Sequence, residues 1–182
     1  DIARGPKIVI SMTAVGHSQL PILRSGAQIG DGIYLSSLTG WSAAGLELLT
    51  REISINSELA EKALSEFSAP TLDYATNFAQ ATAMADISDS ILVQAEQISV
   101  ASGVELALDQ SLIAAAPEFD ELSQIASELK VDVMQWILAG GEDHALLATG
   151  MNLPGVRIGS VVAGSGVTGV ERKMTPVSWS HF

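Results

Sequence analysis

"SILVQAEQISVASGVELALD", residues 90–109, places a helical pattern directly before a strand pattern, and this order decides the fold class. Over residues 90–101 the apolar side chains are spaced for one face of a helix. Gly103 ends the pattern, because glycine readily adopts the left-handed conformation that terminates helices. Residues 104–109 then alternate as a strand does. The stretch therefore predicts a helix followed closely by a strand.

The remaining segments of the sequence also predict both helices and strands. Residues 41 to about 85 have a helical pattern interrupted near 53–57 and at Pro70, which predicts three helices. Further helices are predicted over 118–129 and 131–138, and strands over 7–16, 31–37, 144–149 and 156–163. Because the elements lack regular βαβ alternation, they favour an α+β fold with helices packed on a sheet over a doubly wound fold.

Composition limits the function classes. The 182 residues can form one core, and 47% hydrophobic with 16% charged residues is typical of a globular domain. No long apolar run or signal peptide is present, so we expect a soluble protein without a membrane partner. Absence of cysteine excludes thiolate catalysis and cysteine-ligated metals and fits a cytoplasmic location. A net charge of −12 argues against nucleic acid, although a small phosphate could bind through Mg²⁺ held by carboxylates.

Three suggestive strings are set aside. "GSGVTG" (164–169) matches a dinucleotide-binding pattern, but too few residues follow it for a helix and a second strand. "GWSAAG" (40–45) is more consistent with a helix start, with Ser42 near its N-cap, than with a nucleophile elbow. None of the histidines forms a metal-binding pair on one helix face; they are His17, His144 and His181. Zinc is therefore not indicated.

Asp86 and Asp89 in "DISD" allow two interpretations. In the first, Asp86 or Ser88 is the N-cap of the following helix and Asp89 lies in its first turn, where an acid interacts favourably with the helix dipole. In the second, the two carboxylates and the intervening hydroxyl bind Mg²⁺, which bridges phosphate oxygens. Spacing alone leaves both interpretations open.

Two further segments carry residues suited to a binding site. In "LAGGEDHALLAT" (138–149) a glycine turn delivers Glu142 and Asp143 to the edge of a strand, where a solvated turn is the default interpretation. The tail "VSWSHF" (177–182) would either dock on the core through its aromatic side chains or form an aromatic wall for a flat ligand ring.

In their order and spacing, these strings resemble the C-terminal half of the thiamine-monophosphate kinases, in the aminoimidazole-ribonucleotide-synthetase (PurM-like) superfamily of ATP-dependent enzymes. The resemblance rests on "DIARGP", "ISMTAVG", "LRSGAQIGD", "GWSAAGLELL", "AMADISDS", "ASGVELALD", "LAGGEDHALLAT", "GVRIGSVVAGSGV" and "WSHF". It implies an α+β fold like the PurM C-terminal domain, a mixed sheet with packed helices. It also implies Mg²⁺-dependent transfer of the ATP γ-phosphate to thiamine monophosphate, giving thiamine diphosphate.

The resemblance implies roles for individual residues. Asp86 and Asp89 would be catalytic Mg²⁺ ligands, while Arg4 and Ser88 would contact ATP, because a guanidinium offsets phosphate charge with paired hydrogen bonds. On the substrate side, the resemblance implies that Glu142 binds thiamine monophosphate and Trp179 packs against its rings, a suitable environment for a cationic thiazolium.

The chain departs from the family in ways that modify these expectations. Ser90 stands where the family usually has glycine, and His144 replaces a frequent tyrosine. Residues 1–182 are expected to be a single C-terminal domain, without the family's N-terminal domain that supplies ATP and Mg²⁺ ligands and the homodimer contact. The fragment alone is then expected to be inactive. The alternatives are a noncatalytic binding or scaffold domain with the same fold, or a sister ATP-dependent enzyme of the superfamily.

Overall fold

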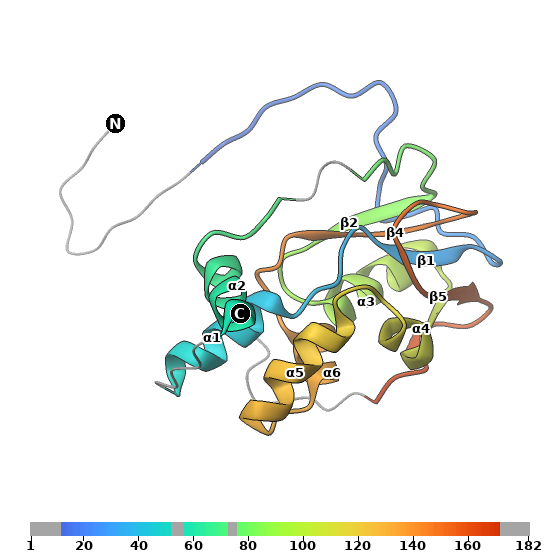
Figure 1. Cartoon of the computed structure of the whole chain (residues 1–182). Helices are drawn as coiled ribbons and strands as arrows, with labels where there is room; N and C mark the ends of the chain where they lie inside the picture. The colour runs from blue at the N-terminus through green and yellow to red at the C-terminus, as the bar shows by residue number, and fades with distance from the viewer. Residues whose placement is uncertain (1–11, 52–56, 73–75, 172–182) are drawn as a thin grey trace.

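A six-stranded mixed sheet organises the molecule. The computed structural model describes residues 12–51, 57–72 and 76–171 (Figure 1). The strands are β1 (Gly32–Leu35), β2 (Ala83–Ile87), β3 (Glu105–Leu108), β4 (Ala145–Gly150), β5 (Val156–Val162) and β6 (Gly166–Thr168). Their order is β2-β4-β1-β5-β3-β6, with every pair antiparallel except β3 and β6. The pairing makes β1, β2, β3 and β6 run in one direction, so their C-terminal ends share one end of the sheet.

The helices gather on one side of this sheet, as Figure 1 shows. They are α1 (Trp41–Thr50), α2 (Glu58–Ser68), α3 (Ile91–Ser102), α4 (Gln110–Ala114), α5 (Phe119–Leu129) and α6 (Val133–Ala139). Helix α3 contacts strands β2, β3, β4 and β6, and α1 packs mainly against α2. The predicted α+β architecture, a mixed sheet with packed helices, is confirmed.

The two faces of the sheet carry different side chains because successive strand residues point to opposite sides. In β1, Ile33 and Leu35 lie in the main core beneath the helices, whereas Tyr34 joins a smaller cluster on the opposite face with Phe78 and Leu153. A fully buried side chain of this size contributes roughly 1.5–3 kcal/mol to the free energy of unfolding. The main core therefore supplies most of the hydrophobic stabilisation, and the smaller cluster covers part of the other face.

Several local predictions are confirmed. Helix α3 ends at Gly103, whose φ of 67° is the left-handed conformation expected of it. The strands predicted over 31–37, 104–109, 144–149 and 156–163 correspond to β1, β3, β4 and β5, and the two predicted later helices to α5 and α6. Each of these segments has a clear hydrophobic period and a bounding turn residue, so local sequence and tertiary packing agree.

The helical interpretation of residues 41 to about 85 is partly wrong. The described residues of this region contain two helices, α1 and α2, and residues 83–87 form strand β2. The alanines of "AMADI" have little strand preference, but Ala83, Ala85 and Ile87 are buried and the strand pairs with β4 along its length. Tertiary pairing therefore overrides local propensity here.

Other segments also differ from the sequence predictions. Helix α4 and strand β6 were not predicted; β6 lies within "GSGVTG" and pairs with β3, so this string forms a sheet edge. Of the strand predicted over 7–16, residues 7–11 lie outside the described residues, and residues 12–16 are exposed and form no strand. That part of the prediction is wrong.

Candidate functional site

Asp86 is the penultimate residue of β2 and faces away from the helices. Its neighbours Ala85 and Ile87 lie in the main core, so alternation turns Asp86 to the opposite face. The side chain is 55% exposed, and its Oδ1 lies 3.8 Å from Nη2 of Arg24. Arg24 reaches this position because the preceding residue, Leu23, accepts a 2.9 Å hydrogen bond from the Met84 N–H at the sheet edge. The sequence analysis assigned no role to Arg24.

Helix α3 is capped by Ser90, immediately after Asp89. The Ser90 side chain accepts a 3.2 Å hydrogen bond from the Val93 N–H, while Asp86 lies within β2. The interpretation in which Asp86 or Ser88 caps the helix is therefore wrong, as is the placement of Asp89 in the first turn. Ser90 has an extended backbone and is 4% exposed, so its hydroxyl serves the helix.

A loop formed by residues 140–144 packs against the turn between β2 and α3. The Glu142 N–H donates to the Ser88 carbonyl oxygen at 2.8 Å, and the His144 N–H donates to the Ile87 carbonyl oxygen at 3.0 Å. The Glu142 carboxylate is 73% exposed and lies 3.9 Å from the His144 ring. The structure thus brings Ser88 and Glu142, more than fifty positions apart, to the same end of the sheet.

Gly141 permits this close approach. A Cβ at this position would lie 2.5 Å from the Asp89 carbonyl oxygen and 2.9 Å from that of Ser88. Gln94, 2% exposed on α3, places its Nε2 3.4 Å from the Asp89 Oδ2. Asp89 therefore lies in a turn bounded by the glycine loop and by α3, next to Ser88 and Glu142.

Asp143 has a role that the sequence analysis missed. Its two carboxylate oxygens accept hydrogen bonds from the Gly40 N–H at 2.8 Å and the Ser42 N–H at 2.9 Å, at the start of α1. Burial raises the pKa of Asp143 to about 6, although these hydrogen bonds act to lower it, and the nearby negative charge of Glu66 raises it further. The default of a solvated turn is wrong for Asp143.

The prediction that Ser42 lies near the N-cap of α1 is confirmed, although the Ser42 side chain does not cap the helix. The helix begins at Trp41 as expected, but its N-cap is Gly40, with a φ of 111° and no side chain to accept a hydrogen bond. The Ser42 hydroxyl is buried and has no hydrogen-bond partner among the described residues. The acceptor for the first N–H groups of α1 comes instead from Asp143, about a hundred residues later.

The remaining predicted site residues, Arg4 and Trp179, lie outside the described residues. Among the residues described, no group of three or more His, Cys, Asp or Glu side chains is arranged to hold a metal ion. Mg²⁺ often keeps several waters and uses one or two protein carboxylates together with substrate phosphates. Asp86 and Asp89 each carry carboxylate oxygens, the ligand type that such a site uses. Within residues 12–51, 57–72 and 76–171, no helix has the length and apolar character needed to cross a membrane.

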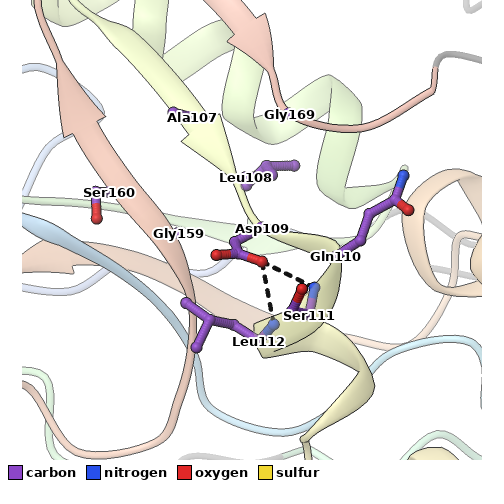
Figure 2. A pocket seen from close by; sticks show the side chains of 9 residues that line it. All are labelled: Ala107, Leu108, Asp109, Gln110, Ser111, Leu112, Gly159, Ser160 and Gly169. Carbon is purple, nitrogen blue, oxygen red and sulfur yellow. Dashed lines mark hydrogen bonds between the residues drawn. The ribbon is translucent and has the colours of Figure 1, made fainter.

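A pocket of about 520 Å³ lies toward the opposite edge of the sheet, between β3, β5 and the start of α4 (Figure 2). Of the predicted site residues that the structure describes, Asp86, Ser88, Asp89 and Glu142, none lines it. Asp109 does line it, but its Oδ1 accepts hydrogen bonds from the N–H groups of Ser111 and Leu112, at 2.8 and 3.3 Å, and caps α4. The carboxylate of Asp109 thus serves the fold.

Curated proteins similar to this sequence share one name. Thiamine-monophosphate kinase of Aquifex aeolicus is 31% identical over 191 residues, covering 100% of this chain and 61% of the relative. The Corynebacterium glutamicum enzyme of the same name is 39% identical over 157 residues, covering 82% of the chain and 46% of the relative. The chain is a homologue of the thiamine-monophosphate kinases. It spans about half the length of the curated relatives it matches. No family model matches the sequence.

Solved thiamine-monophosphate kinases share the fold. The structure "AaThiL complexed with AMPPCP and TMP" matches with a TM-score of 0.76 and 31% identity, covering 88% of this chain and 54% of that one. The Aquifex aeolicus thiamine-monophosphate kinase crystal structure matches with a TM-score of 0.75 and 30% identity, covering 84% and 54%. A hydrogenase maturation protein, HypE, matches at 0.57 with 13% identity, covering 88% of this chain and 59% of its own, and shows the fold alone. The fold is PurM-like.

Proposed function

We propose that this chain forms the substrate-binding half of an ATP- and Mg²⁺-dependent kinase that converts thiamine monophosphate to thiamine diphosphate. The observation that carries the proposal is the contact between the Ser88–Asp89 turn and the loop bearing Glu142. These are the segments to which the family resemblance assigns nucleotide, metal and substrate roles. The names of the relatives support the kinase class.

The nucleotide side of the site would involve Asp86, Ser88 and Asp89. The two carboxylates would hold Mg²⁺, which when bound supplies charge neutralisation at phosphate oxygens. Ser90, and neither Asp86 nor Asp89, is the N-cap residue of α3. Ser88 would contact the nucleotide through its hydroxyl. Arg4, outside the described residues, would complete this side with a guanidinium.

The substrate side would involve Glu142 and Trp179. The exposed Glu142 carboxylate offers a negative charge to the cationic thiazolium of thiamine monophosphate. Trp179, also outside the described residues, would pack against the substrate rings. One solved relative is complexed with AMPPCP and TMP, which supports a nucleotide and a second ligand in the proposed site.

The reaction would be a direct phosphoryl transfer. An oxygen of the thiamine monophosphate phosphate attacks the γ-phosphorus of ATP, the bond from that phosphorus to the β–γ bridging oxygen breaks, and ADP leaves. Positioning and charge neutralisation supply most of the acceleration in such reactions. The residues named here would orient the acceptor phosphate in line with the γ-phosphate.

The proposal also covers domain organisation, oligomeric state and location. A further N-terminal domain, not contained in residues 1–182, would contribute additional Mg²⁺ and ATP ligands and the homodimer contact, and the enzyme would act in the cytoplasm. Residues 1–182 alone would then be monomeric and inactive or nearly so.

The test is thiamine diphosphate formation from thiamine monophosphate, ATP and Mg²⁺ by the intact gene product and by residues 1–182 alone. We expect product from the former only. Glu142→Gln in the intact protein should raise the KM for thiamine monophosphate, whereas Glu128→Gln, an exposed change on α5, should not. Absence of product from the intact protein would favour a noncatalytic domain or a different substrate.

A further inference from the structure

The loop of residues 140–144 is held on two sides. On one side, backbone N–H groups of Glu142 and His144 donate to the carbonyl oxygens of Ser88 and Ile87. On the other side, both carboxylate oxygens of Asp143 accept hydrogen bonds from the first N–H groups of α1. Asp143 lies between the two anchored residues, so its side chain fixes how far the loop stands from α1.

Steric fit adds to these hydrogen bonds. A Cβ at Gly140 would collide with the Trp136 carbonyl oxygen and come within 2.7 Å of the Ala43 Cβ on α1. A Cβ at Gly141 would come within 2.5 Å of the Asp89 carbonyl oxygen. The two glycines therefore allow the loop to fit between α1 on one side and the β2–α3 turn on the other.

The backbone of the loop is also strained. Glu142 and His144, on either side of Asp143, have φ values of 69° and 52°, in the left-handed region that residues with a Cβ seldom adopt. Such conformations persist only where the surrounding structure determines them. Asp143 lies between these two residues, and the two hydrogen bonds that its carboxylate accepts anchor it to the start of α1.

We infer that Asp143 is a positioning residue that holds Glu142 in place beside the Ser88–Asp89 turn. The inference deepens the proposed function and rests on it for the role of Glu142. The Asp143 carboxylate itself accepts hydrogen bonds from the backbone N–H groups of Gly40 and Ser42 at the start of α1. When its carboxylate is removed, the loop loses its link to α1, the strained backbone relaxes, and the Glu142 carboxylate is no longer fixed.

The first test measures backbone order by amide hydrogen exchange in the intact gene product. In Asp143→Ala we expect exchange at Glu142 and His144 to become about tenfold faster, because one side of the loop is released. Asp109→Ala is the matched control: it also removes an aspartate that caps a helix with two hydrogen bonds, but at α4. Unchanged protection at Glu142 and His144, or an equal loss in both variants, would overturn the inference.

The second test separates positioning from general stability. Asp143→Ala should raise the KM for thiamine monophosphate about tenfold with a smaller change in kcat, whereas Asp109→Ala should keep both near the wild type. Asp143→Asn, whose amide oxygen replaces one of the two acceptors, should recover part of the loss and covers the case in which the alanine variant does not fold. Equal KM values in all three variants would overturn the inference. A wild type without turnover would refute the proposed function instead, and amide exchange would still decide the role of Asp143.

Discussion

Two junctions at the same end of the sheet use aspartate differently. After β3, Asp109 comes directly before α4 and its carboxylate caps that helix with two hydrogen bonds. After β2, Asp89 comes directly before Ser90, and the serine hydroxyl caps α3. An aspartate therefore caps the helix that follows β3, whereas a serine caps the helix that follows β2, although the two strands run in the same direction. The comparison shows that an aspartate before a helix cannot be assigned from spacing alone.

The largest expected effect comes from Asp86→Asn in the intact protein. Its carboxylate belongs to the β2 junction and pairs only with the exposed Arg24 at 3.8 Å among the interactions described, a pair that contributes little to stability. Turnover should fall roughly 100-fold, as is usual when a group that stabilises transition-state charge is removed, while the melting temperature stays close to the wild type. Steady-state kinetics and calorimetry measure the two effects.

Asp120→Asn, an exposed aspartate in the first turn of α5, is the control for Asp86→Asn and should leave turnover unchanged. A large fall in melting temperature with turnover retained in Asp86→Asn would place this carboxylate in the same structural class as Asp109.

Gly141→Ala is the next largest expected change. The added methyl group would meet the Asp89 carbonyl oxygen, so the loop and the β2–α3 turn must separate. We expect the free energy of unfolding to fall by about 2 kcal/mol and turnover to fall with it. Gly103→Ala is the matched control, because a Cβ there meets open space and the cost is only that of a left-handed alanine. Retained turnover in Gly141→Ala would show that the contact does not serve the site.

Ser90→Ala and Asp109→Ala test the two helix caps through their effect on the free energy of unfolding. Each removes the side chain that caps a helix, so each should lower the free energy of unfolding by about 1 kcal/mol. Asp89→Ala should lower it by less, because α3 keeps its serine cap. Chemical denaturation measures all three. A greater loss for Asp89→Ala than for Ser90→Ala would contradict the assignment of the cap.

The last prediction concerns the pH dependence of stability and involves no change in turnover. The pKa of Asp143 is raised to about 6 in the folded protein, so its protonated form is favoured by folding. In the unfolded chain the Asp143 carboxyl ionises near pH 4. The free energy of unfolding should therefore decrease as pH rises from about 4 to about 6. Asp143→Asn should lack this decrease when the two proteins are compared across that range by denaturation. An equal pH dependence in both would show that Asp143 titrates normally.

Sequence reasoning succeeded where local pattern and tertiary packing agree. Helix α3 and strand β3 have clear periods on either side of Gly103, and both were predicted close to their observed positions. Strand β2 was missed because its alanines lack strand preference and its pairing partner, β4, lies about sixty residues later. Strand β6 was missed because a short edge strand in a glycine-rich segment has little local signal.

The candidate site shows the same division. The string "DISD" and the string "GGED" identified Asp86, Asp89 and Glu142 as residues of interest, but gave no sign that the two strings touch. The adjacent acids Glu142 and Asp143 looked alike in sequence, whereas in the structure one is exposed and the other is bonded to α1. No spacing rule relates Asp143 to Gly40, because their contact depends on how distant elements pack.

The sequence by itself determined the fold class, the helices and strands with strong periods, and the two acidic segments that carry the proposed chemistry. These properties depend on residue type and short-range spacing, which the linear order contains. Only the tertiary structure decided which carboxylates the fold uses: Asp109 for α4, Asp143 for α1, and neither Asp86 nor Asp89 as the cap of α3. The physical reason is that a carboxylate is assigned by the N–H groups within its reach, and packing brings those groups from distant parts of the chain.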